Sequence, residues 1–205
     1  MINSVRQINW ILLEPSWVSR YDDLCRLDIS IDTFLNMPLS DQNIDRSRYQ
    51  IIPRVLVFPF QHNSVLLLKL LPKHGKVGGW SGFYNGAGGH VERGEDLFSA
   101  ARRELFEETG LSAKLTFCGT ILVDSGDPVG IGLFVFRADE ISGSLKASPE
   151  GIAECISFDL LDKFPLVEDV MFILDKIRSM PVGGPQFSGK SFYDTEGKLK
   201  VIFNS

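Results

Sequence analysis

The chain has 205 residues, of which 44% are hydrophobic and 23% charged, and these proportions suit one soluble packed domain with a small appendage. Its formal net charge of −5 argues against nonspecific binding to nucleic acid, which needs a basic surface. The longest apolar stretch, residues 65–71, is interrupted by Lys69 and is too short to cross a bilayer, so we expect no membrane partner either.

Residues 1–50 form an N-terminal extension in which we find no chemical motif. The pattern predicts a strand at residues 9–14, a helix at 16–27 and a second helix start at 30–35, where Asp32 is the cap. We expect the extension to act as a cap or as a dimerisation element, so a homodimer is one assembly that the sequence allows.

The sequence becomes strand-rich at residue 51, and we assign residues 51–205 to one α/β domain. Apolar runs at residues 51–60 and 65–71 surround a polar turn at 61–64, which predicts a β-hairpin. The elements expected after the hairpin are a glycine-rich loop at 75–79, a helix at 96–109, strands near 114–123 and 130–137, a polar loop at 142–151, a short strand at 155–158, a helix at 168–180 and two strand-like pieces around a turn at 195–197.

The helix predicted at residues 96–109 carries Glu104, Glu107 and Glu108 at positions i, i+3 and i+4. Neighbouring like charges on a helix repel by about 0.2–0.5 kcal/mol per pair, so we expect a positive group among them. At about 100° per residue, Glu104 and Glu108 fall at the edge of the apolar arc and lean toward the protein body. Ionised groups there are tolerated when they are paired or bound to metal, and carboxylate oxygens suit Mg²⁺ or Mn²⁺.

The segment from Gly89 to Leu111 reads as Gly, five residues, Glu, seven residues, Arg-Glu-Leu, one residue, Glu-Glu, one residue and Gly-Leu. It resembles the signature of the Nudix hydrolases at every defined position. The resemblance is strongest at residues 80–111 and implies the Nudix α/β/α sandwich, in which a mixed central sheet lies between helices. A surface helix with a Glu-rich, solvated face is the alternative interpretation.

The resemblance also implies a chemistry and a set of metal ligands. The family chemistry is hydrolysis of a nucleoside diphosphate linked to another group, with Mg²⁺ or Mn²⁺ as cofactor. The implied ligands are the carboxylates of Glu104, Glu107 and Glu108 and a backbone carbonyl at Gly88 or Gly89.

Arg103 and one of two later glutamates are further candidates for the catalytic machinery. Arg103 is most simply a counter-charge that steadies neighbouring carboxylates, with Glu95 as one partner to test. In many Nudix enzymes an acidic residue near the 142–151 loop binds metal or serves as base, and Glu150 and Glu154 lie there. We prefer Glu150 because the turn around it can aim a side chain inward. For both Glu150 and Glu154, the alternative interpretation is a solvated loop carboxylate.

Two segments resemble the oxidised-purine nucleoside triphosphatases within this family. Residues 80–89 are similar to their Trp-Asn-Gly-x-Gly-Gly motif, with tyrosine before Asn85 in place of tryptophan, and residues 164–193 resemble their C-terminal half. The resemblance implies that Asn85, Glu168 and Asp169 recognise the base. The tryptophan that stacks on the base in that group has no counterpart before Glu168, and the acidic pair could equally open the last helix.

Residues 184–191, Gly-Pro-Gln-Phe-Ser-Gly-Lys-Ser, match the phosphate-loop pattern GxxxxGK[ST]. A working phosphate loop lies between a strand and the N-terminus of a helix. Because residues 192–197 have the pattern of a strand and a turn, we interpret the match as coincidental.

The cysteines at positions 25, 118 and 155 are far apart and form no CxxC pair or zinc-ligand spacing. Reduced cysteines in a cytoplasmic protein are the simplest interpretation, and no apolar leader follows a positive N-terminus.

Three functions therefore remain open from the sequence. The first is metal-dependent hydrolysis of an oxidised or ordinary purine nucleoside triphosphate to the monophosphate and pyrophosphate. The second is cleavage of ADP-ribose or of a dinucleotide. The third is a noncatalytic Nudix-fold module that binds a nucleotide, although such modules usually lose signature carboxylates and this chain keeps them all.

Overall fold

The computed structural model describes residues 45, 47–72, 79–181 and 183–204. The chain separates into two units, Met1–Arg46 and Ser47–Ser205, and the second contains nearly all described residues. The strand and helices predicted before residue 45, and most of the predicted 75–79 loop, lie outside the described residues. The domain division at residue 50 stays a prediction.

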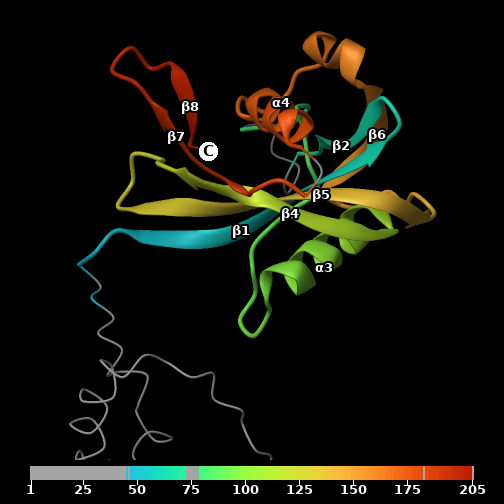
Figure 1. Ribbon diagram of the computed structural model, residues 1–205, viewed down its shortest axis with the longest axis horizontal. Helices are drawn as coiled ribbons and strands as arrows, with labels where there is room; N and C mark the ends of the chain where they lie inside the picture. Colours follow the sequence, from blue (N-terminus) through green and yellow to red (C-terminus); the bar gives the residue numbers. More distant parts are fainter. Residues whose placement is uncertain (1–44, 46, 73–78, 182, 205) are drawn as a thin grey trace, which may run out of the picture. The chain divides into compact units, whose positions relative to one another are not determined.

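A mixed sheet forms the centre of the second unit (Figure 1). Its strands are β1 (Gln50–Gln61), β2 (Ser64–Leu70), β3 (Tyr84–Asn85), β4 (Leu111–Val123), β5 (Val129–Gly143), β6 (Gly151–Ser157), β7 (Phe187–Tyr193) and β8 (Leu199–Asn204). Their order is β3-β2-β1-β5-β4-β7-β8, and β6 pairs with β2. Strand β1 is parallel to β5 and β4 is parallel to β7, while the other neighbours are antiparallel.

Helices α3 (Leu97–Thr109) and α4 (Val170–Ser179) lie on opposite faces of the sheet (Figure 1). The alternation of side chains along β1 explains this. Val55 and Val57 pack into the core beneath α3, whereas Leu56 and Phe58 pack into the core beneath α4. The α/β/α sandwich and the mixed sheet expected from the sequence are both confirmed.

The segment after β3 runs beside β1 and brings the glycines of the signature to the sheet. Val57 N donates to Ala87 O at 2.7 Å, and Val55 N donates to Gly89 O at 2.9 Å. A side chain on Gly88 would overlap the carbonyl oxygen of Val55. Glycine is therefore needed at position 88 for this close pairing.

Helix α3 begins at Leu97, one residue later than the start predicted from the sequence. The Asp96 carboxylate caps the helix by accepting from Phe98 N at 2.8 Å and Ser99 N at 3.0 Å. Asp96, the first residue of the predicted 96–109 helix, is therefore its capping residue and precedes the helical residues. Gly110 ends the helix with φ 75°, the left-handed conformation expected there.

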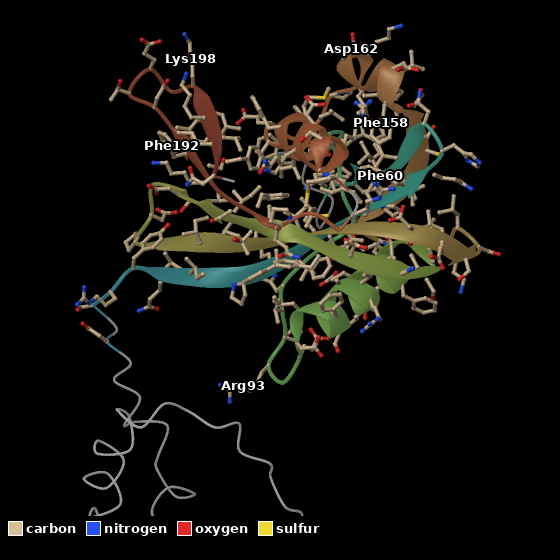
Figure 2. All side chains as sticks on the ribbon, viewed as in Figure 1. Phe60, Arg93, Phe158, Asp162, Phe192 and Lys198 are labelled. Atoms are coloured by element: carbon tan, nitrogen blue, oxygen red, sulfur yellow. The ribbon has the colours of Figure 1, made fainter. Side chains whose placement is uncertain are left out.

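The C-terminal half differs from the sequence pattern mainly in its boundaries. The expected strand at 155–158 is the end of the longer β6, and a 3-10 helix, η4 (Phe158–Lys163), follows it. In Figure 2, Phe60 and Phe158 lie close together where β1 and η4 meet, and their ring centroids are 5.1 Å apart. No helix among the described residues is long and apolar enough to cross a membrane.

Strands β7 and β8 form the predicted hairpin, which stands on the same side of the sheet as α4 (Figures 1 and 2, with Phe192 and Lys198 labelled). The Asp194 carboxylate closes its turn by accepting from Glu196 N at 3.0 Å and Lys198 N at 2.9 Å. The phosphate-loop match ends inside β7, where Gly189 and Ser191 are strand residues. This confirms that the match was coincidental.

Candidate active site

Arg103 connects the signature helix to the loop before it. Its Nε lies 2.7 Å from Glu95 Oε1, and its Nη2 donates to His90 O at 3.0 Å. Its Nη1 lies 2.8 Å from Glu104 Oε1 and 3.2 Å from Glu107 Oε2. The guanidinium is therefore the positive group that the cluster of carboxylates required, and Glu95 is its best-bonded partner.

This bonding perturbs the titration of both partners. Hydrogen bonds from Arg103 lower the pKa of Glu95 from 4.5 to about 2, and a backbone hydrogen bond from Glu92 contributes. The bonds to Glu95 are likewise the main cause that raises the pKa of Arg103. Both groups are consequently ionised at neutral pH.

Glu104 and Glu108 face the glycine segment beside β1. Glu108 is buried, with a relative exposure of 4%, and its Oε2 accepts a hydrogen bond from Gly88 N at 2.7 Å. A Cβ on Gly89 would lie 2.7 Å from Glu104 Cδ, so any larger residue there would push the flexible end of Glu104 aside. Two signature carboxylates and the backbone of residues 88–89 thus form one wall.

Glu107 lies on the outer side of Arg103, and 58% of its side chain is exposed. Within the described ranges, no three Asp, Glu, His or Cys side chains are gathered closely enough to hold a metal ion. The Arg103 guanidinium lies between Glu104 and Glu107 and forms an ion pair with each.

The donor set nevertheless fits a hard divalent cation. Glu104, Glu107 and Glu108 offer carboxylate oxygens, the ligands that Mg²⁺ and Mn²⁺ prefer. The Gly89 carbonyl accepts from Val55 N, and a carbonyl oxygen has a second lone pair. Glu104 and Glu107 would need only to rotate away from Arg103, so these four residues stay our predicted ligands.

A cavity of about 580 Å³ opens beside this wall. The predicted site residues that line it are Asn85, Glu108, Glu150, Glu168 and Asp169. Glu108 belongs to α3, whereas Glu168 and Asp169 precede α4 on the opposite face of the sheet. The fold therefore joins the end of the signature helix to the predicted base-recognition residues in one space.

The cavity also distinguishes between the two acidic candidates near β6. Glu150 lines the cavity. Glu154 instead accepts a hydrogen bond from the hydroxyl of Tyr84 at 2.9 Å, which is a structural role. Glu150 was the residue preferred from the sequence.

Glu168 and Asp169 differ in their surroundings. Glu168 is exposed and accepts a hydrogen bond from the hydroxyl of Tyr193, which raises the pKa of that phenol. Asp169 is half-buried, and the loss of solvent raises the pKa of its carboxyl. Asp169 occupies the capping position of α4 but makes no capping hydrogen bond. A purely helix-capping role therefore does not account for its position.

Sequence reasoning missed three residues that line the cavity, Arg54, Trp80 and Tyr193. Arg54 is a single charge within the apolar run of β1, on the same face as Leu56, and this interruption was a usable signal. Trp80 is 43% exposed, and its ring meets Phe83 edge-on at 5.5 Å. The position of Tyr193 had no local signal, because it depends on how β7 pairs with β4.

The family profile described as NUDIX domain matches residues 50–171. The chain belongs to the Nudix family. The match covers the whole signature from Gly89 to Leu111 and extends into α4.

Two curated relatives have the same name, oxidized purine nucleoside triphosphate hydrolase. The Danio rerio protein is 36% identical over 97 residues, which are 43% of this chain and 62% of that protein. The Mus musculus protein is 39% identical over 77 residues, which are 37% of this chain and 49% of that protein. The alignments thus span less than two thirds of each relative.

Among solved structures, the mutator MutT protein of Bacillus halodurans has a TM-score of 0.61 and 25% identity, over 75% of this chain and 98% of that one. The NUDIX domain of Shewanella oneidensis NrtR, solved with ADP ribose, has a TM-score of 0.53 and 15% identity, over 69% and 97% of the two chains. The second likeness shows the Nudix fold alone.

Proposed function

We propose that this Nudix chain hydrolyses a purine nucleoside triphosphate, oxidised purines included, to the nucleoside monophosphate and pyrophosphate. The observation that carries the proposal is the single cavity shared by Glu108 of the signature helix and by Asn85, Glu168 and Asp169. The names of the two curated relatives support the same substrate class.

Glu104, Glu107, Glu108 and the Gly89 carbonyl would hold Mg²⁺ or Mn²⁺, which when bound neutralises the diphosphate and activates water. Arg103 forms ion pairs with the carboxylates of Glu104 and Glu107, which would rotate away from it to reach the metal. Its bonds to Glu95 and to the His90 carbonyl also tie the loop to the helix.

Glu150 is our candidate for the general base. It lies in the loop that leads into β6, and its neighbours Ser148 and Gly151 are held by the hydrogen bond from Gly151 N to Ser148 Oγ at 3.2 Å. A carboxylate that lines the cavity in a fixed turn can accept the proton of the attacking water.

Arg54 is our candidate for binding the polyphosphate. The cavity is lined by the carboxylates of Glu108, Glu150, Glu168 and Asp169, and Arg54 is the one basic side chain among its described lining residues. A triphosphate entering this acidic space needs a cation besides the metal. Guanidinium groups match the geometry of phosphate oxygens.

The base would be recognised by Asn85, Glu168 and Asp169. Asn85 Oδ1 accepts from Gly86 N at 2.8 Å, which leaves its amide nitrogen as a donor. Burial raises the pKa of Asp169, and its carboxyl oxygens can accept hydrogen bonds from the base. A purine edge presents both hydrogen-bond donors and hydrogen-bond acceptors.

A substrate panel with Mg²⁺ separates this proposal from its two rivals. We expect turnover of GTP, ATP or their 8-oxo forms with release of pyrophosphate. Cleavage of ADP-ribose or a diadenosine polyphosphate to AMP would instead favour the second function. Binding without any turnover, unaffected by Glu108→Gln, would favour a noncatalytic module.

The remaining expectations stay predictions from the sequence. They are a cytoplasmic location, a homodimer, and a small-molecule nucleotide rather than nucleic acid or membrane as the partner. The expected cytoplasmic location was argued from the cysteines. Cys118 is buried, Cys155 is exposed, and both are free thiols. Cys25 lies outside the described residues.

A further inference from the structure

Tyr193 and Glu168 meet at the cavity although they are 25 positions apart in the chain. Tyr193 is the last residue of β7, and Glu168 lies just before α4. Both side chains line the cavity, and Tyr193 is 52% exposed. The hydroxyl of Tyr193 donates a hydrogen bond to Glu168 Oε2.

An exposed glutamate ordinarily samples several rotamers, and its ordering costs about 1.5–2 kcal/mol of side-chain entropy. The bond from Tyr193 removes much of this freedom before any ligand arrives. It also satisfies one carboxylate oxygen of Glu168 and leaves the other to accept from a ligand. Preorganisation of this kind favours a ligand whose donor lies in the matching place.

The two ends of this contact have independent supports. Tyr193 is held by the hairpin, in which it pairs with Leu199. The segment before α4 is held by hydrogen bonds between Tyr84 and residues 165–167, with Tyr84 N donating to Pro165 O at 2.8 Å and Val167 N donating to Tyr84 O at 2.9 Å. Asp169, beside Glu168, also lines the cavity.

We propose that Tyr193 is a positioning residue that sets base selectivity by holding Glu168 as an oriented acceptor beside Asp169. This inference rests on the proposed function of the same site. The favoured class is a purine with an N–H donor on the edge that faces the acidic pair. Tyr193 would act on the base through Glu168 and take no part in cleavage of the phosphoanhydride bond.

The test compares kcat and KM of Tyr193→Phe and wild type with GTP and with CTP. Loss of the hydroxyl should raise KM for GTP about tenfold, as expected for a hydrogen bond to a charged group, and leave kcat unchanged. The GTP/CTP ratio, which is kcat/KM for GTP divided by kcat/KM for CTP, should therefore fall. If Tyr193 had a merely structural role, the substitution would lower kcat/KM for both substrates equally.

Two further variants make the result specific. Tyr84→Phe removes a matching phenol–carboxylate bond, to Glu154, and should leave the GTP/CTP ratio unchanged. In a Glu168→Gln background, Tyr193→Phe should no longer alter the ratio, because the two residues act through one contact. If Tyr193→Phe does not fold, Tyr193→Leu removes the same hydroxyl and should lower the ratio in the same way.

An unchanged GTP/CTP ratio in folded Tyr193→Phe, with an active wild type, overturns this inference and leaves the proposed function standing. A wild type that hydrolyses neither triphosphate overturns the proposed function, and this inference fails with it.

Discussion

The carboxylate of Glu104 packs directly on the Cα of Gly89, so that a Cβ at position 89 would lie 2.7 Å from Glu104 Cδ. The loop glycine and the signature helix are therefore fitted to one another. Gly89→Ala should displace the Glu104 carboxylate at a modest cost in stability of about 0.5–1.5 kcal/mol, because the clash falls on the end of a flexible side chain. Chemical denaturation measures the cost in stability, and calorimetric titration with Mn²⁺ measures weaker metal binding.

Shortening the opposing side chain is the matched control for this substitution. In a Glu104→Asp background, Gly89→Ala should cost less stability than in wild type, because the clash involves the end of the Glu104 side chain. Equal costs in both backgrounds would show that the contact is not the cause.

The Arg103–Glu95 pair predicts a specific loss of stability in acid. The pKa of Glu95 is about 2 in the folded chain against an ordinary 4.5. A lowered folded pKa stabilises the protein fully above the ordinary value, and this contribution is lost as pH falls toward the folded value. Wild type should therefore exceed Glu95→Gln in unfolding free energy at pH 6, and the difference should shrink between pH 4.5 and 2.

Urea denaturation of both proteins at several pH values checks this prediction. Glu92→Gln is a suitable control, because it removes a nearby exposed carboxylate that has no ion pair to Arg103 among the described residues. A pH-independent difference between wild type and Glu95→Gln would rule out the ion pair as its source.

The signature helix and the hairpin of β1 and β2 were predictable because their signals are local. Glu104, Glu107 and Glu108 repeat with the helical period, and the apolar runs of β1 and β2 surround a polar turn. The sequence could not reveal that Arg103 separates Glu104 from Glu107, since that depends on side-chain rotamers.

The cavity was harder to predict because its walls come from distant segments. Asn85, Glu168 and Asp169 were found only through resemblance to known motifs. Arg54 and Tyr193 reach the same space through the parallel pairing of β1 with β5 and of β4 with β7. Such nonlocal pairings leave no periodic pattern within a single segment.

Asp169 predicts a pH dependence opposite in sign to that of Glu95. Burial raises the pKa of Asp169 above its ordinary 3.8, so ionisation is harder in the folded chain than in the unfolded chain. This contribution lowers stability as pH rises from 3.8 through the folded pKa. Asp169→Asn should therefore be more stable than wild type at pH 7, and the gain should disappear in acid.

Thermal melts of wild type and Asp169→Asn from pH 3 to 8 test this sign. Asp162→Asn is the control, because Asp162 is exposed and its change should not reproduce the gain. A melting temperature for Asp169→Asn below that of wild type at pH 7 would mean that the ionised Asp169 is stabilising, contrary to the prediction.

Arg54 predicts a defect in substrate binding rather than in folding. It is half-buried at the cavity and is the one basic side chain among the described lining residues. Arg54→Gln should raise KM for a purine triphosphate about tenfold, as expected for a charge-assisted hydrogen bond to phosphate. Arg54→Lys should recover part of this loss, because it keeps the charge but not the forked geometry.

Steady-state kinetics with GTP and Mg²⁺ at 50 and 300 mM salt separate this role from a structural one. Because screening weakens a charge contact, the KM ratio between Arg54→Gln and wild type should shrink at the higher salt concentration. Arg102→Gln is a matched control, since Arg102 lies on the exposed side of α3 over the Phe98 ring, 5.7 Å from its centroid. An equal rise in KM for Arg102→Gln would point to general electrostatic attraction, and an unchanged KM for Arg54→Gln would remove Arg54 from the phosphate site.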